Sequence, residues 1–189
     1  GLRVETQGSD KTDPNLPIPN TPNTVVVTDS DFSNNTLNGA FFQTRGDATL
    51  IGDMSNSQFT NNGQNGIVVQ TAENSSFGDP TIGLPPGQRS LFNGLIVEDN
   101  GNDGVQITAT QNSRTLLEIN STVNPTSISN NGGDGVGITT TGGRSDILIT
   151  SGAATTTISG NGTTAGGNGV RWDASGASEG VVRVTKTDI

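Results

Sequence analysis

The sequence predicts an all-β solenoid in which short strands stack in parallel from one coil to the next. Three observations lead to this fold class: a composition that disfavours helices, a turn motif that recurs along the chain, and an alternating strand after each copy. Only 29% of the 189 residues are hydrophobic and 27 are glycine, which leaves little material for a broad core. The polar residues are chiefly Asn, Thr and Ser, which favour turns and strand surfaces over helix interiors.

The turn motif occurs five times, and each uninterrupted copy places a glycine seven positions after an apolar residue. The first copies read Phe32-Ser-Asn-Asn-Thr-Leu-Asn-Gly39 and Phe59-Thr-Asn-Asn-Gly-Gln-Asn-Gly66. The next two begin at Val97 and Ile128, and the fifth, 158–169, contains four extra residues. The closing glycines, here called anchor glycines, are separated by 27, 38, 31 and 34 residues, which gives the length of one coil.

An alternating strand follows each anchor glycine, as in Val105-Gln-Ile-Thr108 and Val136-Gly-Ile-Thr139. Further apolar runs, such as Leu116-Leu-Glu-Ile119, bring the count to two or three strands per coil. Asn side chains stacked at one strand spacing can form a hydrogen-bonded ladder, and glycine enters left-handed backbone freely. We therefore expect a turn ladder built from Asn35, Asn62, Asn100 and Asn131 with the anchor glycines Gly39, Gly66, Gly104, Gly135 and Gly169.

From about Val25 to Ile189 the chain resembles the right-handed parallel β-helix family, the pectate-lyase-like solenoids with N-x-x-x-N-G-type turns. That family includes polysaccharide enzymes, phage tailspikes and bacterial surface proteins, so the resemblance implies the fold and leaves the activity open. We expect five to six coils without a capping helix. Residues 1–6 form a strand of a partial first coil, 7–24 a Pro-rich connector, and 25–189 the β-helix with a protruding loop at 78–90.

The two ends of the chain repeat patterns found inside it. Residues 1–6 have the pattern of 169–174, and 182–189 match 25–32 at an offset of 157. An open solenoid end exposes backbone donors and acceptors, so we expect each end to bind another copy or an adjoining module of a longer chain. The predicted end-to-end contacts are Gly1, Leu2, Arg3, Val4, Glu5, Arg171, Trp172, Asp173, Val182, Val184 and Ile189.

Charge and composition exclude several functions. A net charge of −9 repels nucleic-acid phosphates. Cysteine and histidine are absent, which removes disulfides, thiolate and imidazole chemistry and the usual zinc ligands. No stretch approaches the roughly 20 apolar residues of a membrane span. The chain opens at Gly1 without a signal-peptide pattern, which suggests a mature or excised piece. We expect an extracellular or cell-surface protein of a bacterium.

Acidic residues on adjacent coils are the candidates for catalysis and for metal binding. Positions two and four after the anchor glycines hold no carboxylate pair on neighbouring coils, so the two-acid geometry of glycoside cleavage does not assemble there and we expect no enzyme. Asp99, Asp103 and Asp134 lie in successive turns and are candidate ligands of a structural calcium ion, since hard cations take oxygen ligands. The alternative is that these residues replace Asn in the turns. No other cofactor is expected.

The leading functional hypothesis is a structural protein that builds a cell-surface fibre by end-to-end stacking of coils. The first alternative is a carbohydrate-binding or polysaccharide-degrading domain, for which the outward Phe41 offers a ring to stack on a sugar unless the Pro-rich connector covers it. The second is ice binding, prompted by Thr108-Ala-Thr110 and Thr139-Thr-Thr141. Trp172 is expected to point inward on the last coil. Four sequons could carry glycans, at Asn34, Asn74, Asn120 and Asn161.

Overall fold

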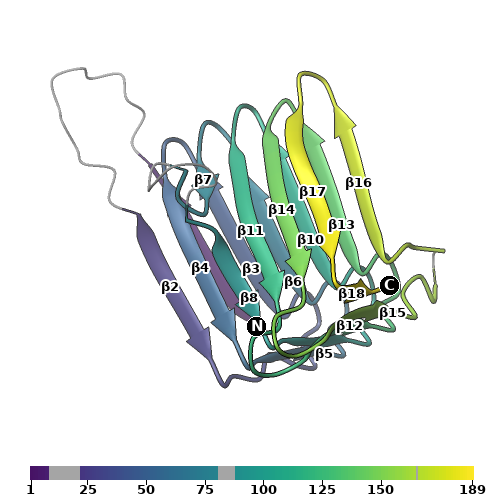
Figure 1. Ribbon diagram of the computed structural model, residues 1–189. Coiled ribbons are helices and arrows are strands. Elements are labelled where there is room, and N and C mark those ends of the chain that lie inside the picture. The colour runs from purple at the N-terminus through teal and green to yellow at the C-terminus, as the bar shows by residue number, and fades with distance from the viewer. Residues whose placement is uncertain (9–21, 81–87, 165) are drawn as a thin grey trace, which may run out of the picture.

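The structure is a computed structural model that describes residues 1–8, 22–80, 88–164 and 166–189. Its described part is all-β and forms a parallel β-solenoid (Figure 1), which confirms the predicted fold class. The strands are β1 (Leu2–Gln7), β2 (Asn23–Thr28), β3 (Ala40–Arg45), β4 (Thr49–Ser55), β5 (Gln58–Thr60), β6 (Ile67–Thr71), β7 (Ser76–Phe77), β8 (Ser90–Asn93), β9 (Ile96–Glu98), β10 (Val105–Thr110), β11 (Arg114–Asn120), β12 (Thr126–Ser129), β13 (Val136–Thr141), β14 (Arg144–Thr150), β15 (Thr156–Ser159), β16 (Val170–Ser175), β17 (Glu179–Thr185) and β18 (Thr187–Asp188).

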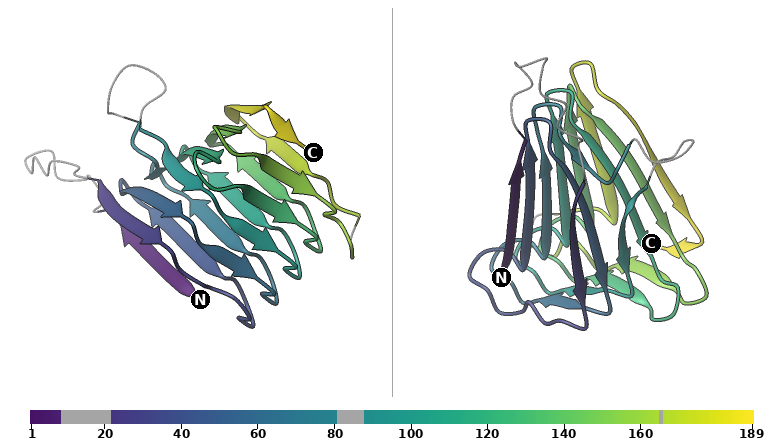
Figure 2. Two further views of the ribbon diagram at one scale, coloured as in Figure 1. Left: turned by 60° about the horizontal axis from the view of Figure 1, so that its bottom comes forward. Right: turned by 90° about the vertical axis from the view of Figure 1, so that its left-hand side faces the viewer.

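Each coil after the first contributes strands to three sheets, which form the faces of the solenoid in Figure 2, and the first coil contributes strands to two of them. Sheet A has the order β1-β3-β6-β10-β13-β16, and sheet B has the order β17-β14-β11-β7-β4-β2, with β8 paired to β11 and β4. Sheet C has the order β18-β15-β12-β9-β5. Neighbouring strands within a sheet come from successive coils and pair in parallel, so the chain advances by one strand spacing, about 4.8 Å, per coil. None of the described residues forms a helix that could span a membrane.

The first coil begins at β1. Leu2 lies opposite Ala40, so β1 occupies the same place in its coil as the strands that follow the anchor glycines. Strand β2 continues the same coil in sheet B, where Val27 lies opposite Met54. The predicted connector therefore joins two strands of one coil. Its central part, residues 9–21, lies outside the described residues.

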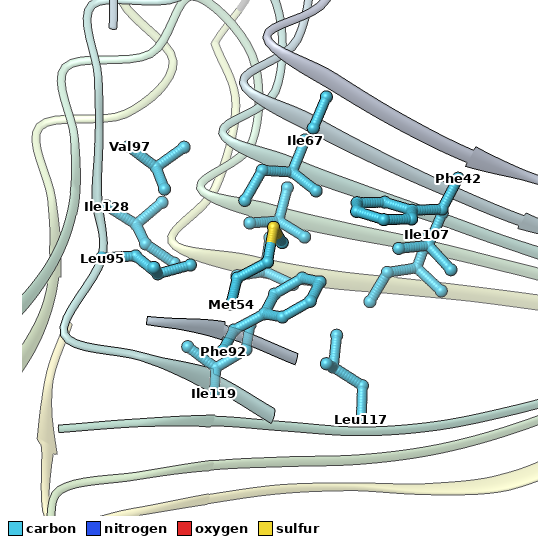
Figure 3. Packing of buried hydrophobic residues seen from close by; sticks show 14 of the residues in the cluster. Phe42, Met54, Ile67, Phe92, Leu95, Val97, Ile107, Leu117, Ile119 and Ile128 are labelled. Atoms are coloured by element: carbon cyan, nitrogen blue, oxygen red, sulfur yellow. The ribbon is translucent and has the colours of Figure 1, made fainter. Parts of the chain in front are cut away.

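Inward side chains stack on their equivalents to form narrow apolar columns. Phe42 and Ile107 come from sheet A, Met54 and Phe92 from sheet B, and Val97 from sheet C; their side chains meet in the interior (Figure 3). All five are buried. Each coil needs only a few apolar residues to extend these columns, which explains how a chain with 29% hydrophobic residues has an ordered core.

The predicted loop at 78–90 interrupts a strand position of sheet B. Phe77 lies opposite Thr115 and Ser90 lies opposite Leu117, so residues 78–89 stand where β11 has a single residue. Asp79 and Gln88 exchange backbone hydrogen bonds of 2.7 and 2.9 Å at the base of the insertion. Residues 81–87 lie outside the described residues. The insertion accounts for the longest spacing between anchor glycines.

Candidate functional site

The predicted Asn ladder is a continuous column of hydrogen bonds along one turn. Asn35, Asn62, Asn100 and Asn131 each donate a backbone N–H and a side-chain Nδ2–H to Oδ1 of the next Asn, at 2.8 to 3.1 Å. The column continues to Asn161, which lies in the interrupted fifth motif copy and is not among the predicted ladder residues. The signal was present in the sequence, since Asn161 follows Ile158 at the same spacing as Asn35 follows Phe32.

A second ladder, which the sequence analysis missed, runs beside the first in the opposite direction. Its members are the residues that immediately precede the anchor glycines: Asn38, Asn65, Asp103, Asp134 and Asn168. The backbone N–H of each member after Asn38 donates to Oδ1 of the equivalent residue in the preceding coil; the bond from Asp134 to Asp103 is 2.8 Å and the bond from Asn168 to Asp134 is 2.7 Å. Asn and Asp are interchangeable here because both supply the accepting oxygen.

The three predicted calcium ligands divide between two columns. Asp99 lies in the left-handed turn position with φ of 55°, whereas Asp103 and Asp134 are neighbours in the second ladder. Arg171 Nη1 lies 3.4 Å from Asp134 Oδ2. The residues that the structure describes contain no group of three or more acidic side chains suited to a metal ion. Calcium binding stays a prediction, and the contacts present assign Asp103 and Asp134 to hydrogen bonding within the turn.

Burial raises the pKa of the Asp103 carboxyl above its ordinary value, and the negative charge of Asp134 raises it further. The backbone N–H of Asp134 and the positive charge of Arg171 act in the opposite direction. Asp103 and Asp134 are two carboxylates on adjacent coils. They lie in the turn before the anchor glycines, outside the strand positions at which the sequence predicts no carboxylate pair. Both acids accept backbone hydrogen bonds, which is a structural role.

The anchor glycines do not have left-handed backbone, so the expected reason for these glycines is wrong. The left-handed positions belong to another column, formed by Asn34, Asn61, Asp99, Asn130 and Gly160. At the anchors the requirement is space between coils. A Cβ on Gly104 would lie 2.8 Å from the carbonyl oxygen of Gly135 and 2.6 Å from Ile128 Cγ2.

The outer face of sheet A carries a mixed row of side chains. Phe41 points outward as predicted, and the Arg3 guanidinium lies over its ring at 4.9 Å from the centroid. The central part of the Pro-rich connector, the alternative partner expected for the Phe41 ring, lies outside the described residues. Thr108 and Thr139 lie opposite each other, yet the next strands present Gln70 and Asp173 at this height. Threonine therefore occupies this position on two neighbouring strands only, between Gln70 and Asp173. The ice-binding hypothesis depends on a longer regular row of threonines.

The first and last coils leave strand edges open in the described structure. Strand β1 pairs only with β3 and β2 only with β4, while β16 and β17 pair only with β13 and β14. Inward side chains of these coils remain partly exposed because the chain has no further described coil to cover them. They are Leu2, Val4 and Val25 on the first coil and Val170, Val182 and Val184 on the last.

The predicted end-to-end residues lie on two opposite ends of the stack. Gly1 precedes Leu2, whose N–H donates to Gly39 at 2.9 Å, and Ile189 lies at the other end with its side chain against Gly169. Trp172 lies in an inward column next to Ile138, as predicted, but 38% of it is exposed at the open end. Each end carries one ion pair along the outer row, Arg3 with Glu5 and Arg171 with Asp173.

Comparison of the chain with family models, with curated proteins and with solved structures finds no match.

Proposed function

We propose that this chain is a structural block of an extracellular fibre, in which the last coil of one copy stacks on the first coil of the next. The observation that carries the proposal is that the first and last described coils expose strand edges and core side chains together. Main-chain pairing across such a joint is β-augmentation. A contact between unlike ends extends into a filament unless its rotation closes a ring.

The apolar columns support a joint that keeps the register of the solenoid. Val27 and Val184 occupy the same inward column of sheet B, which passes through Met54, Phe92, Ile119 and Ile149. In the joint, Val184 of one copy covers Val27 of the next. In sheet A, Val4 and Trp172 likewise belong to one inward column, so Trp172 of one copy covers Val4 of the next. Val27 is already buried in the single chain, so burial of the partly exposed Val4, Trp172 and Val184 supplies the apolar part of the association energy.

The charges of the two ends oppose this joint. In register, Arg3 meets Arg171 and Glu5 meets Asp173, and like charges directly opposite each other in a sheet are destabilising. The net charge of −9 adds repulsion between copies. Salt screens both terms, so association is expected to strengthen as ionic strength rises.

The location outside the cell is proposed from composition. The chain has no cysteine, is acidic, and is rich in Asn, Thr and Gly, a pattern shared with long secreted bacterial fibres to which the repeat bears a resemblance. The second candidate function, a carbohydrate-binding domain, has the partly exposed Phe41 ring in its favour. That ring is already covered on one side by Arg3, so the fibre remains the better supported proposal.

The experiment substitutes Val26, which is 65% exposed and lies on the outer face of β2 in the column that ends at Arg183. In the joint, residue 26 of one copy lies beside Arg183 of the next. Val26→Glu is therefore expected to strengthen association, and Val26→Lys to weaken it. Repulsion by net charge alone predicts the reverse order, because the Glu variant carries more negative charge.

Association is measured by sedimentation velocity over a range of concentrations, and filaments are observed by negative-stain electron microscopy. Val123→Lys is the matched control, because Val123 is 81% exposed in the coil that contains β11 and β12, away from both ends. It is expected to behave like the unmodified chain apart from the small effect of one charge. Single rods at every concentration and salt level, or Lys and Glu variants with equal association, would refute the proposal.

A further inference from the structure

Four arginines converge on a groove in the outer face of sheet B. Its volume is about 690 Å³, and its charged lining consists of Arg89, Arg114, Arg144 and Arg183 with Glu118 and Asp146. The chain has only 9 basic residues and a net charge of −9, so this concentration of guanidinium groups is a local reversal of the overall charge. Of these arginines, the proposed fibre joint involves only Arg183.

The groove is built by the register of three neighbouring strands and by the insertion. Arg114 of β11 lies opposite Arg144 of β14, and Leu148 of β14 lies opposite Arg183 of β17. Arg89 comes from the base of the loop just before β8. Its Nη1 donates to the carbonyl oxygens of Leu117, at 3.3 Å, and Asp146. Arg89 thereby forms one wall of the groove.

Asp146 organises the arginines from below. Its Oδ2 accepts hydrogen bonds from Arg114 Nη2 at 3.2 Å and from Arg144 Nε at 2.7 Å. Its side chain is only 7% exposed. Among the described residues, Asp146 Oδ1 and Arg114 Nε are buried and have no hydrogen-bond partner. Buried charged groups normally satisfy these bonds. Arg114 Nε is a donor, so its missing partner is an acceptor such as the oxygen of an anion, whereas Asp146 Oδ1 is an acceptor whose missing partner is a donor.

The charge in the groove remains positive after its own acids are counted. Two carboxylates line it against four guanidinium groups, and the exposed Glu179 also contacts Arg144, at 3.2 Å. A guanidinium has five N–H donors in a planar fork that matches the oxygens of carboxylate, sulfate and phosphate groups. Burial lowers the pKa of Arg89, but an arginine still stays protonated in proteins.

We propose that this groove binds an oxyanion, which the guanidinium groups of Arg114, Arg144 and Arg183 hold over the buried Asp146. The apolar side chains of Leu148 and Val181 lie beside these arginines in the same groove. An oxyanion carried on a carbon skeleton contacts both surfaces, whereas a free inorganic anion contacts only the arginines. The shared chemistry is the negatively charged oxygen, and the choice of probes separates the two sources.

The test follows the arginine Nε–Hε resonances by ¹⁵N–¹H NMR at a concentration at which the chain sediments as single rods. Sodium sulfate, acetate and butyrate are titrated at ionic strength held constant with sodium chloride. We expect saturable shifts at Arg114 and Arg144 with a Kd on the order of millimolar, as befits ligands of a few atoms. Tighter binding of butyrate than of acetate indicates a carbon-borne oxyanion, and preference for sulfate indicates an inorganic one.

Arg183→Gln is the principal variant, since Arg183 is exposed and its side chain makes none of the hydrogen bonds or ion pairs described here. It is expected to weaken binding of the best probe about tenfold, the effect of losing one charge-assisted contact. Arg45→Gln removes the same charge from an exposed position on β3, outside the groove, and is expected to bind as the unmodified chain does. Equal weakening in the two variants, or shifts that never saturate, would overturn the proposal.

Discussion

Asn100 donates its side-chain Nδ2–H to Oδ1 of Asn131 at 2.8 Å, and its backbone N–H reaches the same oxygen at 3.1 Å. Its own Oδ1 accepts the equivalent pair of bonds from Asn62. A second bond from Nδ2 reaches the carbonyl oxygen of Phe59 at 2.9 Å. One side chain therefore links three coils, and each rung depends on the rungs on both sides.

Asn100→Ala is expected to lower the free energy of unfolding by about 3 kcal/mol, because it leaves two donors of Asn62 and one carbonyl without their buried partner. Urea unfolding followed by circular dichroism measures the change. Asn102→Ala is the control: Asn102 is exposed two positions away, and its loss is expected to cost less than about 0.5 kcal/mol. A ladder without energetic importance would give equal values for the two variants.

Gly104→Ala tests whether the anchor glycines are selected for space. The added methyl group would lie within 2.8 Å of three atoms of the next coil, so we expect a loss of about 3 kcal/mol in unfolding free energy from overpacking. The comparison is Gly142→Ala, where φ is +65° and nothing lies within 4 Å. Only backbone strain of about 1 kcal/mol is expected there. The reverse order of costs in urea unfolding would show that backbone conformation decides.

The order of the coils could be predicted from sequence because it is encoded in columns of equivalent residues. The offset of 157 between 25–32 and 182–189 is the register observed in sheet B, where Val27 and Val184 share a column. The match between residues 1–6 and 169–174 likewise places Gly1 at an anchor position, and Leu2 lies opposite Ala40. These predictions depend only on repeated sequence patterns and do not require knowledge of how the side chains pack in the interior.

The second ladder and the arginine groove could not be derived in the same way. The ladder mixes Asn with Asp, and the sequence alone does not distinguish acids that bind a metal ion from acids that replace Asn in the turns. The groove depends on Arg89, which reaches the carbonyl of Asp146 across 57 residues of sequence, from an insertion into sheet B that the other described strands of this sheet lack. An irregular segment breaks the periodicity on which the sequence argument depends, and its contacts emerge only in three dimensions.

Asp103→Asn is expected to stabilise the fold at neutral pH. Burial makes the folded-state pKa of Asp103 higher than the unfolded value, near 3.8, so the folded chain binds this proton more tightly. That contribution is complete below pH 3.8 and is lost as pH rises through the folded-state pKa. Asparagine keeps the accepting oxygen without the charge. The gain in unfolding free energy should be present at pH 7 and shrink toward zero at pH 3.

Urea unfolding at pH 3, 5 and 7 measures this dependence. Asp31→Asn serves as the control, since Asp31 is exposed and removal of its charge has the same effect on net charge. A gain that is equal at all three pH values, or equal in both variants, would show that the carboxylate of Asp103 carries no burial cost.

A hydroxyl column at the corner between sheets A and B leaves one group unpaired. Thr44 bonds Ser75 at 2.9 Å, and Thr71 bonds Ser113 at 2.9 Å. In the next coil, Ala109 takes the place of the threonine and Gly143 takes the place of the serine, so neither residue has a hydroxyl group. The first coil departs from this pattern.

Thr6 Oγ1 is buried and has no hydrogen-bond partner among the described residues, because the turn residue that corresponds to Ser75 is Ala48. Ala48→Ser supplies the missing hydroxyl, and we expect it to raise the free energy of unfolding by about 1 kcal/mol, the net value of one hydrogen bond. The gain should vanish in a Thr6→Ala background, because the added hydroxyl then lacks its partner. Urea unfolding of the four combinations gives this coupling as a double-mutant cycle. An equal gain in both backgrounds would mean that the added hydroxyl acts on the turn itself and not through Thr6.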